Sequence, residues 1–487
     1  MKKLQKTIAA IIAIGMVLAM LLSLSACNKD KITFIIYNWE EYIDEDIIES
    51  FKEYYKNKEG KDIEIKYSTF DTNETMLTKI INGDAKVDVI CPSEYAIERL
   101  LKKGMLAKLD IDKMENYANI DPMITANIDE FFGKVETPNG IVNMNDYFVP
   151  YLWGTLGILY NTEKVRAEDL AQGWGLLWNK ANNPELNGKI LMKDSIRDSI
   201  AATVFYLKEI GALPEAHKDK SAQELINAID TDLLAAVEKV LKEQKPILKG
   251  YEVDFGQEDM MLKYAYVDLA WSGDALFAID ETEHLAYFVP ESGGNIWFDG
   301  WVVPTTSAHK DIAMMWIDYL CNPVIAMKNM IETGYTAGID PQVMQETPDA
   351  ITILQDNNYD IEEFFSNPNR YPTEVEHLGI MEDLDEFSSQ AVDMWERVKA
   401  ESHGPNIWII VFSILGGLII VGGAVAYFLT AKKRRRFTVA RPAIAKMEVT
   451  QKEVAPNAEA EQALKEPAES KREDFENTQM DNDEPKE

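Results

Sequence analysis

The chain has 487 residues, more than a single small domain needs, and its 46% hydrophobic content is enough to build a folded core. Acidic side chains (82) outnumber basic ones (49), so the formal net charge is −33. Such a chain repels phosphate backbones, which argues against nucleic acid as a partner and favours cationic ligands. Three cysteines, five histidines and no paired Cys or His spacing argue against a disulfide framework and a zinc site.

The N-terminus has the organisation of a secretory signal. Three lysines within the first six residues precede an unbroken apolar or small-residue run from Ile8 to Leu24. The run ends in Leu24-Ser25-Ala26-Cys27, which resembles the lipobox of bacterial lipoproteins. We therefore expect residues 1–26 to be a lipoprotein signal peptide and Cys27 to carry a lipid. The alternative is an ordinary signal peptide with an incidental cysteine.

A second hydrophobic segment lies near the C-terminus. Residues 407–429 carry no charge and are long enough to cross a bilayer, and a basic cluster at 432–436 marks the cytoplasmic side. We expect a transmembrane helix at 407–429, followed over 430–487 by a basic juxtamembrane segment and a disordered acidic tail. A buried core helix is the poorer alternative, because nothing apolar follows for it to pack on. The protein is then a lipid-anchored, single-pass protein of the cell membrane, with an extracytoplasmic binding domain and a cytoplasmic tail.

Between these ends, strand-like and helix-like segments alternate. Apolar segments rich in β-branched residues predict strands at 32–37, 63–67 and 87–91. An amphipathic segment follows each strand, and the cluster 71–73 and Ser93 stand where helix N-caps are expected. A strand–helix unit repeated three times argues for a parallel sheet.

The pattern continues towards residue 400. Strands are predicted at 147–151, 156–160 and 189–192, and helices at 196–209, 222–243 and 308–320. This part of the chain is longer than one core comfortably supports, so we expect two α/β lobes. Ligands of such sheets lie at the carboxyl ends of the strands, and two lobes offer a cleft between them.

The sequence carries no nucleophile elbow, phosphate-binding glycine loop or HExxH motif, so we expect no catalytic role, cofactor or metal. Its recurring feature is an aromatic residue close to a carboxylate where a strand gives way to a loop. An ammonium group is attracted to an aromatic face, and a carboxylate adds a charge-assisted hydrogen bond. The recurrence therefore indicates an organic cation, such as a linear polyamine, as ligand. The instances are Trp39-Glu40-Glu41-Tyr42, Glu94-Tyr95, Trp271 with Asp274, and Trp297 with Asp299.

With these motifs, residues 32–400 are similar to the spermidine- and putrescine-binding proteins of bacterial ABC transporters. The resemblance implies a two-lobe α/β fold of the periplasmic-binding-protein type, with a cleft between the lobes. It also implies a first lobe of 28–147 and 299–340 and a second of 148–298 and 341–402. The matching motifs are YNWEEY (37–42), STFDTNETM (68–76), PSEY (92–95), PYLWGT (150–155), WSGD (271–274) and GGNIWFD (293–299).

The resemblance implies roles for single positions. Asp299 matches the carboxylate that holds one ammonium, and Asp198 matches an acidic position that holds another amine. Asp274 and Glu41 match acidic residues of the putrescine-type members. The whole expected ligand-binding set, whose tryptophans and Tyr42 would wall the polyamine chain, is Trp39, Glu40, Glu41, Tyr42, Ser93, Tyr95, Ser195, Asp198, Trp271, Asp274, Trp297, Asp299 and Tyr335.

Two positions depart from the family pattern. Ser195 stands where spermidine binders carry an Asp, and the segment near Met381 offers no match for their late Gln. These departures lean slightly towards a diamine, although the choice between putrescine and spermidine stays open.

The expected function is a receptor that captures polyamines and delivers them to an ABC permease and its ATPase. The alternative is a membrane-anchored polyamine sensor that signals through its transmembrane helix and tail. For Cys91 and Cys321 we expect two free buried thiols, with a disulfide as the alternative.

Overall fold

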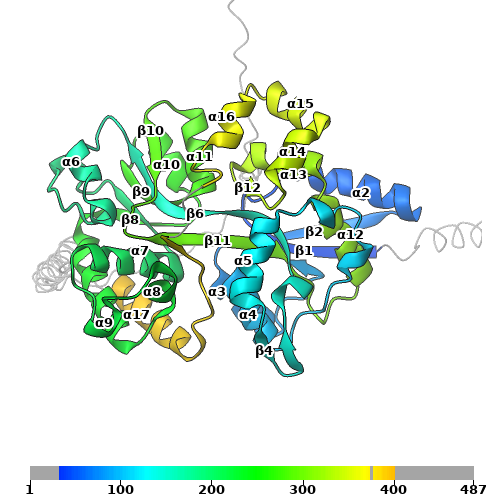
Figure 1. Ribbon diagram of the computed structural model, residues 1–487, viewed down its shortest axis with the longest axis horizontal. Coiled ribbons are helices and arrows are strands. Elements are labelled where there is room, and N and C mark those ends of the chain that lie inside the picture. Colours follow the sequence, from blue (N-terminus) through cyan, green and yellow to red (C-terminus); the bar gives the residue numbers. More distant parts are fainter. Residues whose placement is uncertain (1–31, 373–376, 401–487) are drawn as a thin grey trace, which may run out of the picture. The chain divides into compact units, whose positions relative to one another are not determined.

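The computed structural model describes residues 32–372 and 377–400 (Figure 1). The expected signal peptide with Cys27, the expected span at 407–429 and the tail all lie outside these residues. Among the helices of the described part, none is long and apolar enough to span a bilayer.

The N-terminal part of the described chain forms a parallel sheet. Its strands are β1 (Ile32–Trp39), β2 (Ile63–Phe70) and β3 (Val89–Ile90), in the order β2–β1–β3. The pairs are parallel because a helix crosses over after each strand, α2 (Glu45–Glu59) after β1 and α3 (Asn73–Ile81) after β2. The parallel sheet predicted from the sequence is confirmed.

Side-chain caps fix where these helices begin. The Asp44 side chain accepts a hydrogen bond from the backbone N–H of Asp46 at the start of α2. The Thr72 side chain accepts one from the N–H of Thr75 at the start of α3, inside the predicted capping cluster. At the other end of α2, Gly60 has φ 66°, a left-handed conformation that suits glycine.

The second sheet is mixed and larger. Its strands follow the order β13–β11–β6–β9–β7–β8, and β10 and β12 also pair with β6. β6 (Val149–Asn161) and β11 (Gly294–Trp301) are antiparallel neighbours, and nearly all of their residues are buried. The other strands of this sheet are β7 (Ile190–Lys193), β8 (Leu248–Glu252), β9 (Val267–Trp271), β10 (Leu285–Phe288), β12 (Thr336–Ala337) and β13 (Leu378–Gly379).

The two strands predicted at 147–151 and 156–160 are a single strand, since β6 runs without a break. Gly154 lies in the middle of it. A Cβ atom at this position would lie 2.3 Å from Ser272 Oγ. Only glycine therefore lets the strand pass so close to the helix that begins at Ser272. The residue that looks like an interruption in the sequence is what allows the strand to continue.

Helices cover the second sheet. The predicted helix 222–243 is wrong as one element, because α8 (Ala222–Asn227) ends and α9 (Thr231–Gln244) begins anew. Asp230 starts the new helix by accepting a hydrogen bond from the N–H of Leu233 at 2.8 Å. The prediction at 196–209 is confirmed by α7. The other helices here are α6 (Ala167–Leu170), α7 (Ile196–Glu209), α10 (Gly256–Met261), α11 (Ser272–Glu281) and α17 (Ser388–Ala400).

The core around β1 is rich in aromatic side chains. The ring of Trp316 meets Phe51 edge-on at 5.0 Å and Trp301 at 5.8 Å between centroids. Trp316 belongs to the helix that the sequence predicted at 308–320. The helices of this part, with a small hairpin of β4 (Val135–Thr137) and β5 (Gly140–Val142), are α4 (Glu94–Lys102), α5 (Pro122–Phe132), α12 (Lys310–Leu320), α13 (Pro323–Thr333), α14 (Pro341–Glu346), α15 (Pro348–Asp356) and α16 (Ile361–Ser366).

A second core, with Trp174 and Phe205, lies among α7, α9 and α17. Figure 1 shows these helices around one end of β6 and β11, and α2 and α12 around the other. Met344, Leu354 and Phe364 of α14–α16 belong to the first core, although the sequence placed 341–402 in the second lobe. The lobe boundaries themselves stay a prediction.

β6 and β11 connect the two cores. Val149 of β6 is buried in the first core and Ile158 of the same strand in the second. The end of β11 continues into Val302, which exchanges backbone hydrogen bonds with Ile90 of β3 at 2.8 and 3.0 Å. β6 therefore passes from one core to the other, and β11 runs beside it.

Cys91 and Cys321 are both buried, and neither forms a disulfide. The expectation of two free thiols is confirmed.

Candidate ligand-binding site

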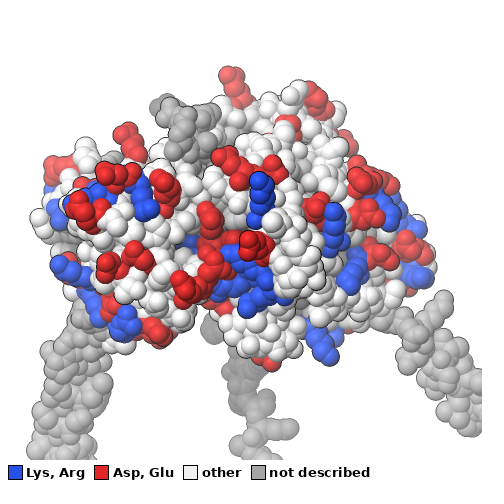
Figure 2. Space-filling view, turned by 60° about the horizontal axis from the view of Figure 1, so that its bottom comes forward, with Lys and Arg blue, Asp and Glu red and all other residues white. Residues whose placement is uncertain are grey.

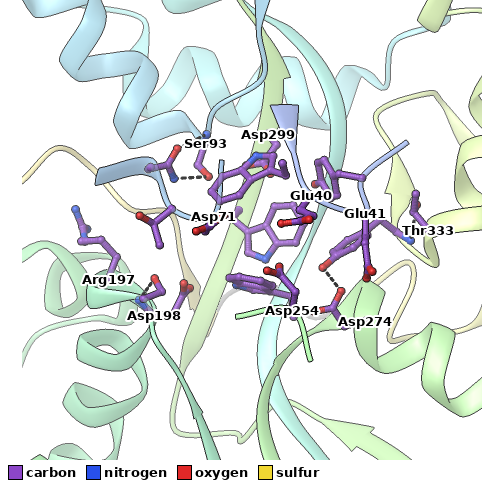
Figure 3. Close-up of a pocket in the computed structure, with 18 of the residues that line it drawn as sticks. Glu40, Glu41, Asp71, Ser93, Arg197, Asp198, Asp254, Asp274, Asp299 and Thr333 are labelled. Carbon is purple, nitrogen blue, oxygen red and sulfur yellow. Dashed lines mark hydrogen bonds between the residues drawn. The ribbon is translucent and has the colours of Figure 1, made fainter. Parts of the chain in front are cut away.

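A cavity of about 490 Å³ lies where the loops after β1, β3 and β9 meet the side of β11. All thirteen residues expected from the sequence line it, although they come from segments between Trp39 and Tyr335. In Figure 3, Ser93 and Asp299 lie on one side of this cavity, Asp198, Asp254 and Asp274 lie on the other, and Glu41 is to their right. The carboxyl ends of strands meet here, as in other open α/β sheets.

Asp299 is the deepest carboxylate of the predicted set. It lies on β11, is only 5% exposed, and its Oδ1 atom has no hydrogen-bond partner among the described residues. Burial raises the pKa of Asp299 to about 7, while the hydroxyls of Ser93 and Tyr42 lower it and the Asp198 carboxylate raises it. A buried acceptor without a partner is costly, so this atom is suited to a cationic donor from outside the chain.

Ser93 supports Asp299 in an unexpected way. It holds the N-cap position of α4, as predicted, but its side chain makes no cap hydrogen bond. Instead its Oγ accepts a hydrogen bond from Asn73 Nδ2 at 2.9 Å, and its backbone bridges to Asp299. The hydroxyl hydrogen is thereby free to point to the Asp299 carboxylate.

Aromatic rings wall the cavity and pack against one another. Tyr335 meets Tyr42 at 4.9 Å and Trp297 at 5.6 Å, both edge-on. The indole N–H groups of Trp39 and Trp297 are buried without a partner in the described chain. Gly273 provides the floor under Tyr335, because a Cβ atom there would lie 2.1 Å from the tyrosine ring.

Asp198 approaches from the first turn of α7. Ser195 is the N-cap of this helix, and its Oγ accepts the backbone N–H of Asp198 at 3.5 Å. Burial raises the pKa of Asp198, and hydrogen bonds from Ser195 and Trp271 oppose that rise. The serine that replaces the family's Asp therefore serves mainly to begin the helix.

Asp274 has partners within the protein on both oxygens. The Tyr335 hydroxyl donates to Oδ1, and the ammonium of Lys193 lies 3.4 Å from Oδ2. Lys193 is 2% exposed, lies 2.7 Å from Glu252 Oε1 and stands 4.1 Å from the centroid of the Trp271 ring. Lys193 was not predicted as part of the site, since the predicted strand stopped at Met192.

The charges of Lys193, Glu252 and Asp274 depend on one another. Burial lowers the pKa of Lys193, but the carboxylates of Glu252 and Asp274 outweigh it, so the net direction is upward. Burial raises the pKa of Glu252 to about 7, although Lys193 opposes the change. The raised pKa of Lys193 keeps its ammonium charged beside these carboxylates.

Further lining residues lie outside the expected ligand-binding set. Glu94 is fully buried, and burial raises its pKa to about 8 while its Oε2 accepts the N–H of Phe298 at 2.9 Å. Partial desolvation at the rim of the cavity raises the pKa of Asp254 to about 6; Lys193 opposes this rise, and Asp274 and Glu40 add to it. Arg197 stacks 4.7 Å above the Tyr95 ring. Only Glu94 had a signal, as part of the motif around Ser93.

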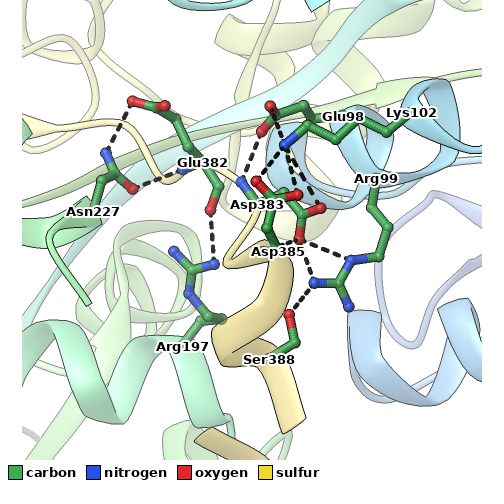
Figure 4. A network of polar contacts seen from close by, with 9 residues as sticks. All are labelled: Glu98, Arg99, Lys102, Arg197, Asn227, Glu382, Asp383, Asp385 and Ser388. Atoms are coloured by element: carbon green, nitrogen blue, oxygen red, sulfur yellow. Dashed lines mark hydrogen bonds and ion pairs between the residues drawn. The ribbon is translucent and has the colours of Figure 1, made fainter. Parts of the chain in front are cut away.

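A polar network beside the cavity joins α4 to the segment before α17 (Figure 4). Arg99 pairs with Asp383, and Lys102 Nζ lies 2.9 Å from both Glu98 Oε1 and Asp385 Oδ1. Glu98 Oε2 also accepts the backbone N–H of Asp383 at 2.7 Å. Figure 2, which brings the lower side of Figure 1 forward, shows basic and acidic side chains meeting near the middle of this face. The network therefore ties α4 to residues 383–388, of which Leu384 is buried in the second core.

Comparisons with known proteins agree with this geometry. A family model of bacterial extracellular solute-binding proteins matches residues 47–353. The spermidine/putrescine-binding periplasmic protein of Salmonella typhimurium is 29% identical over 348 residues, which are 69% of this chain and 89% of that protein. The putrescine-binding periplasmic protein SpuD of Pseudomonas aeruginosa is 26% identical over 67% of this chain and 82% of its own length.

A solved structure shows the same fold. The spermidine/putrescine ABC transporter substrate-binding protein PotD of Streptococcus pneumoniae superposes with a TM-score of 0.54 at 26% identity, covering 76% of this chain and 99% of that one. The mixed α/β fold expected from the sequence is therefore of the periplasmic-binding-protein type. The family binds solutes for ABC transporters and is not a family of enzymes. This chain belongs to the bacterial extracellular solute-binding protein family.

Proposed function

We propose that this chain is an extracytoplasmic receptor that captures a polyamine, putrescine or spermidine, and delivers it to an ABC permease and its ATPase. The observation that carries the proposal is Asp299, a buried carboxylate whose Oδ1 lacks a protein partner and which lies between tryptophan walls. The Salmonella and Pseudomonas relatives, which are a spermidine/putrescine-binding and a putrescine-binding protein, support the same ligand class.

The charge of the cavity suits a linear polycation. Ten lining residues are acidic, and within the described chain Arg197 is the single basic residue among them. Its guanidinium is already engaged, stacking on Tyr95 and donating to the backbone oxygen of Glu382 at 2.8 Å. Carboxylates hold the ends of a polyamine, and the flat rings of Trp39 and Trp297 accept its methylene groups and ammonium faces.

Ligand binding is coupled to closure of two lobes in this proposal. We divide the lobes as 28–147 with 299–340 and 148–298 with 341–402, and the packing of α14–α16 on the first core favours moving residues 341–366 to the first lobe. Asp299 and Ser93 contact the ligand from one side and Asp198 from the other. Because only the closed state offers both sets of contacts, the ligand selects it, and β6 and β11 act as the hinge.

The ends of the chain complete the proposal. A lipid on Cys27 and a span at 407–429 would hold the receptor on the outer face of the cell membrane, as their sequence patterns favour. Mass spectrometry of the mature N-terminus tests the lipid, and protease protection of the tail in intact cells tests the span. A mature chain that begins elsewhere than at residue 27, or a tail cleaved from outside, would contradict the respective anchor.

Calorimetric titration of the full-length chain tests the receptor function. We expect putrescine or spermidine to bind with a Kd of about 1 µM or tighter, because a desolvated charge pair at each end outweighs the ordering cost. A neutral sugar serves as the control ligand and is expected to give no heat of binding. If neither polyamine binds, the family scaffold serves another ligand and the proposal fails.

A further inference from the structure

The number of carboxylates left free in the cavity bears on the charge of the ligand. Four buried or half-buried carboxyl groups line the cavity, and three of them, Asp299, Asp198 and Asp274, belong to the expected ligand-binding set. The fourth is Glu94, whose Oε2 already accepts the backbone N–H of Phe298. The described residues provide no ion pair for Asp299 or Asp198, whereas Asp274 is paired with Lys193. The chain thus fills one of its three candidate ammonium positions with a cation of its own.

The position of Lys193 is held firmly. Its ammonium lies 2.7 Å from Glu252 Oε1, donates to the backbone oxygen of Val253 at 2.9 Å and lies 3.4 Å from Asp274 Oδ2. Glu252 is itself anchored, because its Oε2 accepts the backbone N–H of Gly256 at 2.9 Å. The Lys193 side chain is 2% exposed and does not line the cavity, so solvent does not compete for its charge.

The same ammonium occupies a face of an aromatic wall. Lys193 Nζ stands 4.1 Å from the centroid of the Trp271 ring, and Trp271 lines the cavity. An aromatic ring that already interacts with one cation attracts a second cation less strongly. Trp271 is therefore better suited to contact the methylene groups of the ligand than its ammonium groups. Lys193 therefore weakens two partners that a ligand ammonium would use, Asp274 and Trp271.

Carboxylates at the mouth do not replace the lost position. Glu40, Glu41, Asp71 and Asp254 are exposed to solvent. Water screens an exposed carboxylate, so these four attract a polycation to the opening without fixing one charge in place. A third ligand ammonium would be desolvated near Lys193 without a partner of its own.

We propose that Lys193 is a specificity-determining residue, an internal counter-ion of Asp274 that restricts the site to ligands with two positive charges. The inference rests on the proposed polyamine function and deepens it: the ligand class is a linear diamine held between Asp299 and Asp198. A triamine binds more weakly, since its third ammonium meets an occupied position.

The first test is titration of the full-length wild-type chain with putrescine and spermidine at one ionic strength. We expect putrescine to bind about fivefold more tightly or better. Equal or tighter binding of spermidine overturns the inference while leaving the receptor function intact. Absence of binding by both ligands instead overturns the proposed function, so the two failures are distinguishable.

Variants then test whether Lys193 causes the preference. Lys193→Met should lower the Kd ratio of spermidine to putrescine by about fivefold, because Asp274 becomes available. The double variant K193M/E252Q, which removes both members of the buried ion pair, should show the same shift. Lys189→Met, which removes an equal charge outside the cavity, should keep the ratio within about twofold of wild type.

The Kd ratio of spermidine to putrescine distinguishes a role in specificity from a merely structural one. Loss of packing weakens the binding of both ligands alike and leaves this ratio unchanged. An unchanged ratio in the Lys193 variants that fold overturns the inference. If K193M does not fold, the double variant decides, because it removes the buried Lys193–Glu252 pair as a unit rather than leaving Glu252 charged and alone. If neither variant folds, the wild-type preference decides alone.

Discussion

Two charged groups of this protein are buried almost equally but used in opposite ways. Asp299 is 5% exposed and keeps an oxygen without a partner among the described residues, whereas Lys193 is 2% exposed and has Glu252, Asp274 and a backbone oxygen around it. The Lys193 cluster satisfies its charge within the chain and so contributes to structure. Asp299 leaves its charge unsatisfied and so depends on a ligand. Burial alone therefore does not mark a binding residue; the absence of an internal partner does.

The strongest test of this contrast is to break the Lys193 pair. Glu252→Leu removes the nearer carboxylate and leaves Lys193 with Asp274 at 3.4 Å. We expect the free energy of unfolding to fall by about 3 kcal/mol, because a buried ammonium that loses its nearer counter-ion is costly. Urea unfolding measures the change. Glu163→Gln, which breaks the exposed pair with Lys263, should cost no more than about 0.5 kcal/mol. Equal effects would mean that the Lys193 pair contributes no more than a surface pair.

The reverse effect is expected at Asp299. Asp299→Asn should weaken polyamine binding by about tenfold or more, because a ligand ammonium loses a desolvated carboxylate. Stability should not fall, since the wild-type oxygen has no cationic partner among the described residues to lose. Calorimetry and urea unfolding of the same variant measure both quantities. Unchanged affinity would remove Asp299 from the site.

The pH dependence should separate binding from stability. Burial raises the pKa of Asp299 to about 7, so the ionised form that holds an ammonium is lost as pH falls below about 7, and affinity should drop by up to about tenfold per pH unit. The unfolded chain ionises this carboxyl near its ordinary value. Its contribution to stability of the unliganded protein is therefore present at low pH and lost as pH rises through about 7. Asp299→Asn should flatten both profiles, and a wild-type affinity independent of pH between 6 and 8 would contradict the assignment.

The smallest effect is expected in the network of Figure 4. Arg99→Met leaves Asp383, which is nearly buried, with Lys102 at 3.9 Å as its remaining ion-pair partner. We expect a loss of about 1 kcal/mol in the free energy of unfolding. Lys108→Met, which breaks a more exposed pair with Asp146, serves as the control and should change stability by less. A larger loss of stability in Lys108→Met than in Arg99→Met would show that burial of the carboxylate does not determine how much these ion pairs contribute to stability.

Much of the site was predictable because it lies in short motifs. The aromatic–carboxylate pairs around Trp39 and Asp299 mark strand ends. All thirteen residues that the family resemblance assigned to the site line one cavity in the structure. Lys193 was missed because it ends an apolar strand, where a charged side chain usually turns to water, and Glu252 was missed because no strand was predicted at 248–252. Their mutual burial depends on two strands, β7 and β8, that pair only in the fold.

The fold, like the site, was predictable where local patterns decide it and not where distant segments meet. Local patterns predicted the crossover helices of the first sheet, since each carries its own cap and apolar face. The break between α8 and α9 was missed because apolar periodicity continues across it, and the Asp230 cap competes with that pattern only once the helices pack. The continuity of β6 was missed because the need for Gly154 comes from Ser272, far away in sequence.

Gly273 has a consequence for anyone who wishes to redesign this protein. The Tyr335 ring rests directly on its main chain, where even a methyl group would collide at 2.1 Å. The depth of the cavity at this point is thus fixed by backbone rather than by a side chain that can rotate aside. Enlarging the site for a bulkier amine therefore requires a smaller side chain at position 335. Any side chain at position 273 would instead make the cavity smaller.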